Sequence, residues 1–301
     1  MVDLARWKGA GSARGELFRM LRARLGALAC MVLLGLALPG CGAEGRGDSD
    51  RSQDRVVDLS RWIDAVDGSL VTFVALDGTT GQVVRHNAAR AMEPFVPAST
   101  FKIPHALIAL ELGVLTGPDH TLERGGEGLS QGAVGPSETQ TLALAISNST
   151  VWYFQEVARR IGREPMAAWL SGLDYGNRQA GPDLERFWLD GDLRISADQQ
   201  VDFLRRLWTG ELPVAGEAVE LVKGMLVLDD LPGRKVWGKT GTTAAGPEGP
   251  IIWLVGTWEK APGDLIYFAL NLHGEEARAR WGTPEARLGL VQRLLRALER
   301  E

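Results

Sequence analysis

The chain has 301 residues, of which 45% are hydrophobic and 24% charged, a composition ordinary for a soluble globular protein. Its net charge of −5 gives no reason to expect a nucleic-acid partner. Cys30 and Cys41 are the only cysteines and the four histidines are scattered, which excludes a disulfide framework in the body of the chain and leaves no metal site to predict.

The N-terminal segment has the features of an export signal. Residues 1–24 carry six basic side chains, and the stretch LGALACMVLLGLALP that follows (25–39) is apolar but too short for a comfortable membrane span. It ends at Cys41 in Leu-Pro-Gly-Cys, which resembles the lipobox of bacterial lipoproteins. We therefore expect a signal over 1–41, lipidation of Cys41 and a periplasmic, membrane-tethered protein, with ordinary signal cleavage as the alternative. Residues 42–55 are polar and predict a flexible tether.

One domain is predicted over 56–301, where the composition is even and no second linker occurs. Hydrophobic periodicity and turn residues predict strands over 70–76, 82–85, 236–237, 251–258 and 265–272, and helices over 101–112, 150–161, 197–208 and 285–298. Strands at both ends with helices between them indicate an α+β fold, in which an antiparallel sheet receives an inserted helical region.

The first motif with chemical meaning is Ser99-Thr100-Phe101-Lys102, an S-x-x-K sequence. A helix that begins near Ser99 places Lys102 one turn on and on the same face. A serine hydroxyl is a poor nucleophile until a base accepts its proton, and an uncharged lysine amine is such a base. Taken alone, the motif is equally compatible with an ordinary helix start.

The second motif is Lys239-Thr240-Gly241, which follows a short strand-like run. K-T-G together with S-x-x-K is the signature of penicillin-binding proteins and serine β-lactamases. The lysine supplies positive charge for a substrate carboxylate, and the glycine allows the backbone to approach the ligand.

Further segments distinguish among the protein families that share these two motifs. Ser149-Thr150-Val151 occupies the place of the S-D-N motif, and Tyr175-Gly176-Asn177 and then FWLDGDLRIS (187–196) follow it. Together with PASTFKIPHALIALE (97–111), STVWYFQ (149–155), GKTG (238–241) and WLVG (253–256), these segments resemble the class D, or OXA-type, serine β-lactamases over about 71–298. The resemblance implies the penicillin-recognising serine-hydrolase fold and β-lactam substrates.

In that family the S-x-x-K lysine reacts with CO₂ to become a carbamate (N6-carboxylysine), which serves as general base in both acylation and deacylation. The resemblance therefore implies that Ser99 is the nucleophile and that Lys102 is carbamylated, with no other cofactor. Because the amine must be neutral to bind CO₂, apolar walls that lower its pKa are expected, and Phe101 and Val151 are candidates for them. By the same resemblance, Trp188 donates its indole N–H to the carbamate.

The remaining roles also come from the resemblance. Ser149 relays a proton to the leaving nitrogen, Lys239 and Thr240 hold the substrate carboxylate, and the backbone N–H groups of Ser99 and Thr242 form the oxyanion hole. An arginine on the last helix also binds the carboxylate, for which Arg287 is the match and Arg280 the rival. His105 stands where the family usually has asparagine, and we expect it to lie off the reaction path.

Two alternatives share the nucleophile but do not turn over β-lactams. A D,D-peptidase lacks a proficient deacylating base, and the FWLDG segment, Val151 and the short single domain argue against it. A β-lactam sensor of the BlaR type stays acylated. Such sensors carry several membrane helices and a metalloprotease region, whereas here one short apolar run precedes the domain and no H-E-x-x-H occurs.

Overall fold

The computed structural model describes residues 54–63, 70–124, 139–231, 234–243 and 249–298. All of them belong to one unit, Asp50–Glu301. The predicted signal with Cys41 and most of the predicted tether lie outside the described residues. The end of the tether is a correction, because Arg55 begins strand β1 (Arg55–Val56). Within the described ranges, no helix combines the length and apolar character needed to cross a bilayer.

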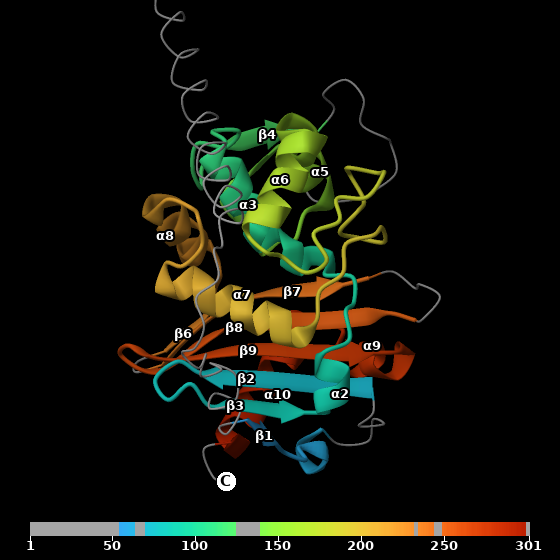
Figure 1. The fold of residues 1–301 in the computed structure, drawn as a ribbon, viewed down its shortest axis with the longest axis vertical. Coiled ribbons are helices and arrows are strands. Elements are labelled where there is room, and N and C mark those ends of the chain that lie inside the picture. The colour runs from blue at the N-terminus through green and yellow to red at the C-terminus, as the bar shows by residue number, and fades with distance from the viewer. Residues whose placement is uncertain (1–53, 64–69, 125–138, 232–233, 244–248, 299–301) are drawn as a thin grey trace, which may run out of the picture. The chain divides into compact units, whose positions relative to one another are not determined.

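A seven-stranded sheet in the order β1-β3-β2-β9-β8-β7-β6 forms the framework (Figure 1). Its other strands are β2 (Val71–Asp77), β3 (Val83–His86), β6 (Val227–Leu231), β7 (Arg234–Thr242), β8 (Ile251–Ala261) and β9 (Asp264–His273). The prediction of a sheet built from both ends of the domain is confirmed. All neighbouring strands are antiparallel except the short edge strand β1, which pairs with β3 in parallel.

Both faces of the central strands are buried, and their side chains alternate between two cores. Along β8, Ile251, Trp253 and Val255 join the larger core, whereas Ile252 and Leu254 join the core beneath the C-terminal helix. This is the two-residue period of a strand covered on both sides. The central strands are thereby held firmly on both faces, and β7, which carries the K-T-G residues, pairs with β8 along its length.

Helices cover both faces. The segment between β3 and β6 supplies α2 (Ala88–Ala91), α3 (Lys102–Glu111), α4 (Leu142–Ser147), α5 (Val151–Ile161), α6 (Arg163–Gly172), α7 (Ala197–Thr209), α8 (Gly216–Met225) and the small hairpin of β4 (Thr121–Glu123) and β5 (Thr139–Thr141). Short α9 (Glu275–Trp281) and α10 (Pro284–Leu298) follow β9. Helix α7 packs on β2 and β9, and α10 joins the core of the opposite face. Figure 1 shows α3, α5 and α6 gathered beyond β7, which is the predicted inserted helical region.

Local sequence sets the limits of α7, which crosses the sheet. Ser196 caps its first turn in a capping box with Gln199, and Gly210 ends it in the left-handed region at φ 75°. Just before this cap, Ile195 exchanges two backbone hydrogen bonds of 2.9 Å with Phe95. The chain that leads to Ser99 is thereby tied to the chain that leads away from Trp188.

Candidate active site

Ser99 and Lys102 lie at the junction of a 3₁₀ turn (Ala98–Phe101) with α3. The Nζ of Lys102 donates to the Oγ of Ser99 over 2.8 Å, as the i, i+3 spacing predicts. Ala98, directly before the serine, has φ 49°, which is uncommon for a residue with a side chain. The turn thus presents the hydroxyl to the amine from a strained backbone.

Lys102 is fully buried, and its surroundings are apolar on one side. Its Nζ lies 5.3 Å from the centre of the Phe154 ring. Burial lowers the pKa of this amine well below its ordinary value, and the charge of Lys239 lowers it further. Burial therefore favours the neutral form of the amine, which is the form that accepts a proton.

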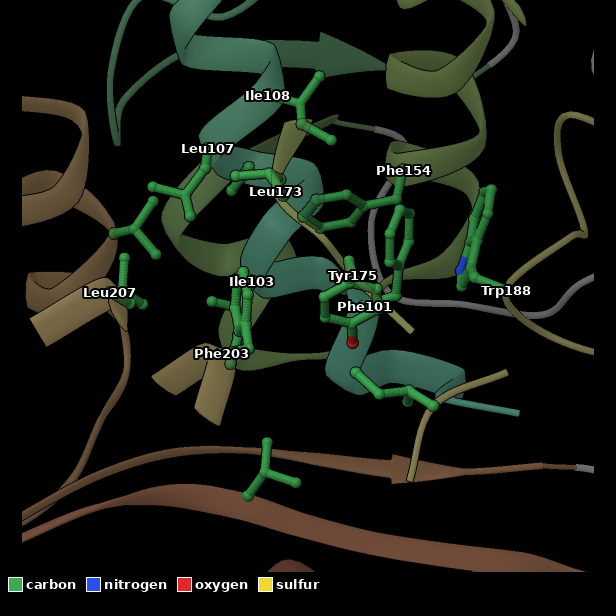
Figure 2. Close-up of a cluster of buried hydrophobic side chains, with 14 of the residues drawn as sticks. Phe101, Ile103, Leu107, Ile108, Phe154, Leu173, Tyr175, Trp188, Phe203 and Leu207 are labelled. Carbon is green, nitrogen blue, oxygen red and sulfur yellow. The ribbon is translucent and has the colours of Figure 1, made fainter. Parts of the chain in front are cut away.

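The Phe154 ring beside Lys102 belongs to a cluster of aromatic rings. The ring of Phe101 lies 5.8 Å from that of Trp188, and Figure 2 shows both rings on one side of the core cluster with Phe154. The Nε1 of Trp188 is buried and has no hydrogen-bond partner among the described residues. Val151, the other predicted wall, is only partly buried at the first position of α5. Phe154, three residues on, supplies the ring that the sequence interpretation did not identify.

His105, which we expect to lie off the reaction path, belongs to the same aromatic cluster. Its ring centre lies 5.2 Å from those of Phe101, Phe154 and Trp188. The reason is the helical repeat of α3, because His105 stands three residues after Lys102 and so shares its face. That spacing is a signal in the sequence, but its meaning depends on which face of the helix meets the pocket.

Ser149 and Lys239 form the second pair of the site. Ser149 lies in the turn between α4 and α5 with φ 56°, and its Oγ accepts from Lys239 Nζ over 3.0 Å. Lys239 is 4% exposed on β7 and also donates to the carbonyl of Thr240 at 3.1 Å. Burial, with a smaller contribution from Arg287, lowers the pKa of Lys239 to about 8. The lysine is thus mostly cationic at neutral pH and is held by oxygen atoms.

Gly241 brings the end of β7 against the nucleophile. A Cβ at this position would lie 2.9 Å from the carbonyl oxygen of Pro97 and 3.2 Å from the backbone nitrogen of Ser99. Any side chain would therefore push the strand away. The close approach brings Thr242, the next residue on β7, to the part of the site where we expect the oxyanion hole.

Arg287 reaches β7 from α10, whereas the rival Arg280 is exposed and lies over the ring of its neighbour Trp281. All five N–H donors of Arg287 have acceptors: the Oγ1 of Thr242 and the carbonyls of Gly241, Trp253, Trp281 and Gly282. Burial lowers its pKa to about 10. A ligand carboxylate would contact this guanidinium only by replacing one of these acceptors.

The Tyr175-Gly176-Asn177 motif holds the segment that carries Trp188. Tyr175 is buried with its ring 5.7 Å from that of Phe101. A Cβ on Gly176, at φ 55°, would lie 2.0 Å from the carbonyl oxygen of Arg194. Asn177 Nδ2 donates to the carbonyl of Asp192 at 2.8 Å, and its Oδ1 accepts from the Arg194 N–H at 3.0 Å. The motif therefore positions one wall of the Lys102 pocket.

Within the described ranges, no group of three or more His, Cys, Asp or Glu side chains is arranged to hold a metal ion. The chemical groups that do converge are two serine–lysine pairs, an aromatic pocket and the end of a β-strand. They come from the start of α3, the turn before α5, the Trp188 segment and β7.

Comparisons with known proteins show which proteins the chain is similar to. Residues 71–288 match the penicillin binding protein transpeptidase domain. The chain is 35% identical over 204 residues to beta-lactamase OXA-20 of Pseudomonas aeruginosa, which covers 65% of this chain and 74% of that protein. It is similar to the crystal structure of the class D beta-lactamase YbXI from Nostoc, with a TM-score of 0.69 and 34% identity over 76% of this chain and 93% of that one.

A regulatory protein is also similar. The chain is 31% identical over 221 residues to regulatory protein BlaR1 of Bacillus licheniformis, and this alignment covers 73% of the chain but 36% of that protein. The similarity to BlaR1 thus extends over about a third of that protein.

Proposed function

The chain belongs to the class D β-lactamase family, and on that premise we propose that it hydrolyses β-lactams through an acyl-enzyme on Ser99. The observation that carries this proposal is the 2.8 Å contact between Lys102 Nζ and Ser99 Oγ. Because burial favours the neutral amine, the nucleophile has a proton acceptor beside it before substrate arrives.

In the proposed acylation, the Oγ of Ser99 forms a bond to the β-lactam carbonyl carbon and its proton passes to the base. The ring C–N bond then breaks, and the nitrogen takes a proton that Ser149 relays. Ser149 suits this role because Lys239 is hydrogen-bonded to its hydroxyl. Water then attacks the ester carbon, and Ser99 leaves with a proton, so that one water is consumed for each ring opened.

A positively charged group must also hold the substrate carboxylate. Lys239, with a pKa of about 8, is mostly charged at neutral pH and reaches the hydroxyls of Ser149 and Thr240. We propose that the carboxylate binds to Lys239 and Thr240, and that Arg287 contributes through the hydroxyl of Thr242, to which it donates at 2.7 Å.

We further propose that Lys102 carries a carbamate. Its nitrogen lone pair attacks the carbon of CO₂, one C–O π pair moves to oxygen, and the nitrogen loses a proton to solvent. When formed, the carbamate would supply a general base for both acylation and deacylation. The residues present fit such a group, because burial of Lys102 disfavours the ammonium and the unpartnered Nε1 of Trp188 needs an acceptor.

The competing function is a β-lactam sensor that acylates and does not turn over, and the similarity to BlaR1 favours it. Stopped-flow and mass spectrometry with benzylpenicillin separate the two. We expect an adduct on Ser99 that forms and then clears, and no adduct in Ser99→Ala. A stable adduct in the wild type supports the sensor, and an adduct on another residue rejects Ser99.

We also propose that the protein is exported and tethered to a membrane through lipidated Cys41. The basic segment, the apolar run and the lipobox-like Leu-Pro-Gly-Cys support this location.

A further inference from the structure

His105 is a buried ionisable side chain to which the proposed mechanism gives no role. It is fully buried, and neither of its ring nitrogens has a hydrogen-bond partner among the described residues. Buried polar atoms are nearly always hydrogen-bonded, so two such nitrogens in one ring require an explanation. The Nε1 of Trp188 is also buried without a hydrogen-bond partner among the described residues, and the Trp188 ring centre lies 5.2 Å from that of His105.

These unpartnered atoms belong to the aromatic cluster that contains Phe154, the ring beside the Lys102 amine. The centre of the Phe154 ring lies 5.2 Å from that of His105 and 5.3 Å from Lys102 Nζ, so both groups neighbour the same ring. Lys102 is also near enough to act electrostatically on His105 and, after burial, is the second cause of its lowered pKa. His105 therefore lies within electrostatic range of the nucleophile's base, and the ring of Trp188 packs against it.

The protonation state of His105 makes it a neutral donor. Burial lowers its pKa to about 3, so the ring carries one N–H and one lone pair throughout the working pH range. Because no described residue engages either nitrogen, the ring is free to hold its proton on either one. An anion in a dry pocket is stable only where such donors are present.

We propose that His105 is a positioning residue that donates its N–H, together with Trp188, to the carboxylate formed on Lys102 by CO₂. This inference rests on the proposed function, because it needs that carboxylate. A carboxylate has two oxygen atoms and accepts several hydrogen bonds, so the indole and imidazole donors do not compete. The two unpartnered side chains then have a common acceptor.

Two substitutions of His105 distinguish the effect of its N–H donor from the effect of its aromatic ring. His105→Phe keeps an aromatic side chain among Phe101, Phe154 and Trp188 but has no N–H, whereas His105→Asn keeps an N–H donor. A hydrogen bond to a charged group predicts about a 10- to 150-fold loss of CO₂ affinity in His105→Phe. His105→Asn should retain most of the affinity. Both variants keep Ser99 and Lys102.

The readout is ¹³C NMR of the enzyme titrated with ¹³C-bicarbonate, with Lys102→Ala as the blank. The expected result is a carbamate signal in the wild type, weak binding in His105→Phe and near-wild-type binding in His105→Asn. Unchanged affinity in His105→Phe, or equal loss in both variants, would overturn the role of the N–H. The absence of a wild-type signal at any bicarbonate concentration would reject the carbamate itself and this inference with it.

A measurement on the wild type covers the case in which His105→Phe does not fold. With ¹⁵N-labelled histidine, the ring N–H resonance of His105 should shift downfield as bicarbonate is added, in step with the carbamate signal. The other three histidines, His86, His120 and His273, serve as internal controls. A carbamate signal that grows while the His105 resonance stays still contradicts the proposal.

Discussion

Lys239 Nζ lies 3.0 Å from Ser149 Oγ, although 90 residues of chain separate the two. The lysine comes from β7 and the serine from the turn before α5, so the pair joins the sheet to the helical region. It places a cation beside the hydroxyl that we propose as the proton relay. The same lysine also lowers the pKa of Lys102, which connects the two serine–lysine pairs electrostatically.

Ser149→Ala tests the relay. Loss of a positioned proton-transfer group should slow acylation by about 10²–10⁴-fold, because the leaving nitrogen then lacks its proton donor. Single-turnover kinetics with benzylpenicillin measure this step. Ser147→Ala, an exposed serine at the end of α4, is the matched control and should behave as the wild type. Normal acylation in Ser149→Ala would rule out the relay.

The pH profile of kcat/KM tests the charge of Lys239. The pKa of this group is lowered to about 8, so it loses its proton as the pH rises through that value, and substrate carboxylate binding should weaken there. We therefore expect an alkaline limb near pH 8 in kcat/KM, which reports the free enzyme. Lys239→Arg stays charged and should lack this limb. Persistence of the limb in that variant would assign it to another group.

Gly241→Ala tests the close approach of β7 to the nucleophile. The added Cβ would lie 2.9 Å from the Pro97 carbonyl oxygen, so the strand or the turn at Ser99 must move and kcat/KM should fall at least about 10²-fold, as a 1 Å misplacement does. Gly224→Ala is the control, since this glycine lies in α8 with open space around it. That change should stabilise the fold by about 0.5–1 kcal/mol with full activity.

Arg287→Ala and Arg280→Ala distinguish the two arginines. Removal of Arg287 leaves five acceptors without their donor in a buried region, and we expect a loss of about 3 kcal/mol or more in the free energy of unfolding. Arg280 is exposed, so its removal should change stability by about 0.5 kcal/mol or less. Urea denaturation measures both. Equal effects would contradict the structural role of Arg287.

Cys41→Ser tests the membrane tether. Without the thiol, lipidation at this position is impossible, and active enzyme should appear in the soluble periplasmic fraction. Cell fractionation followed by a β-lactam hydrolysis assay measures the distribution, with Cys30→Ser as the matched control. Membrane association that is unchanged in Cys41→Ser would favour ordinary signal cleavage or another attachment.

Much of the architecture follows from sequence periodicity. The four predicted helices end within one residue of α3, α5, α7 and α10, because α5, α7 and α10 each have an apolar face and the almost wholly buried α3 is an apolar run followed by Gly113. Helix α6 was not predicted, since Gly162 alone separates it from α5 and Pro165 in its first turn resembles a loop signal. Strand β7 is longer than the predicted 236–237, because its lysine and glycines gain their extended form from pairing with β8.

The sequence likewise predicts some of the contacts in the candidate site and not others. Motif spacing placed Ser99 with Lys102, and the resemblance supplied Ser149 with Lys239, and the structure brings each pair into contact. Phe154 and His105 were not assigned to the pocket because their type alone is equally consistent with core packing. Their position depends on the rotation of α3 and α5 about their axes, which only the packed helices determine.

The left-handed backbone at Ala98 and Ser149 has a consequence for improving the enzyme. Residues held in such sparsely populated conformations cost about 1–3 kcal/mol each, and here one precedes the nucleophile and the other is the proposed relay. A glycine at position 98 would relieve the steric part of that cost but would also release the geometry that aims Ser99 at its base. Selection for heat resistance and selection for turnover therefore act in opposite directions at these two positions.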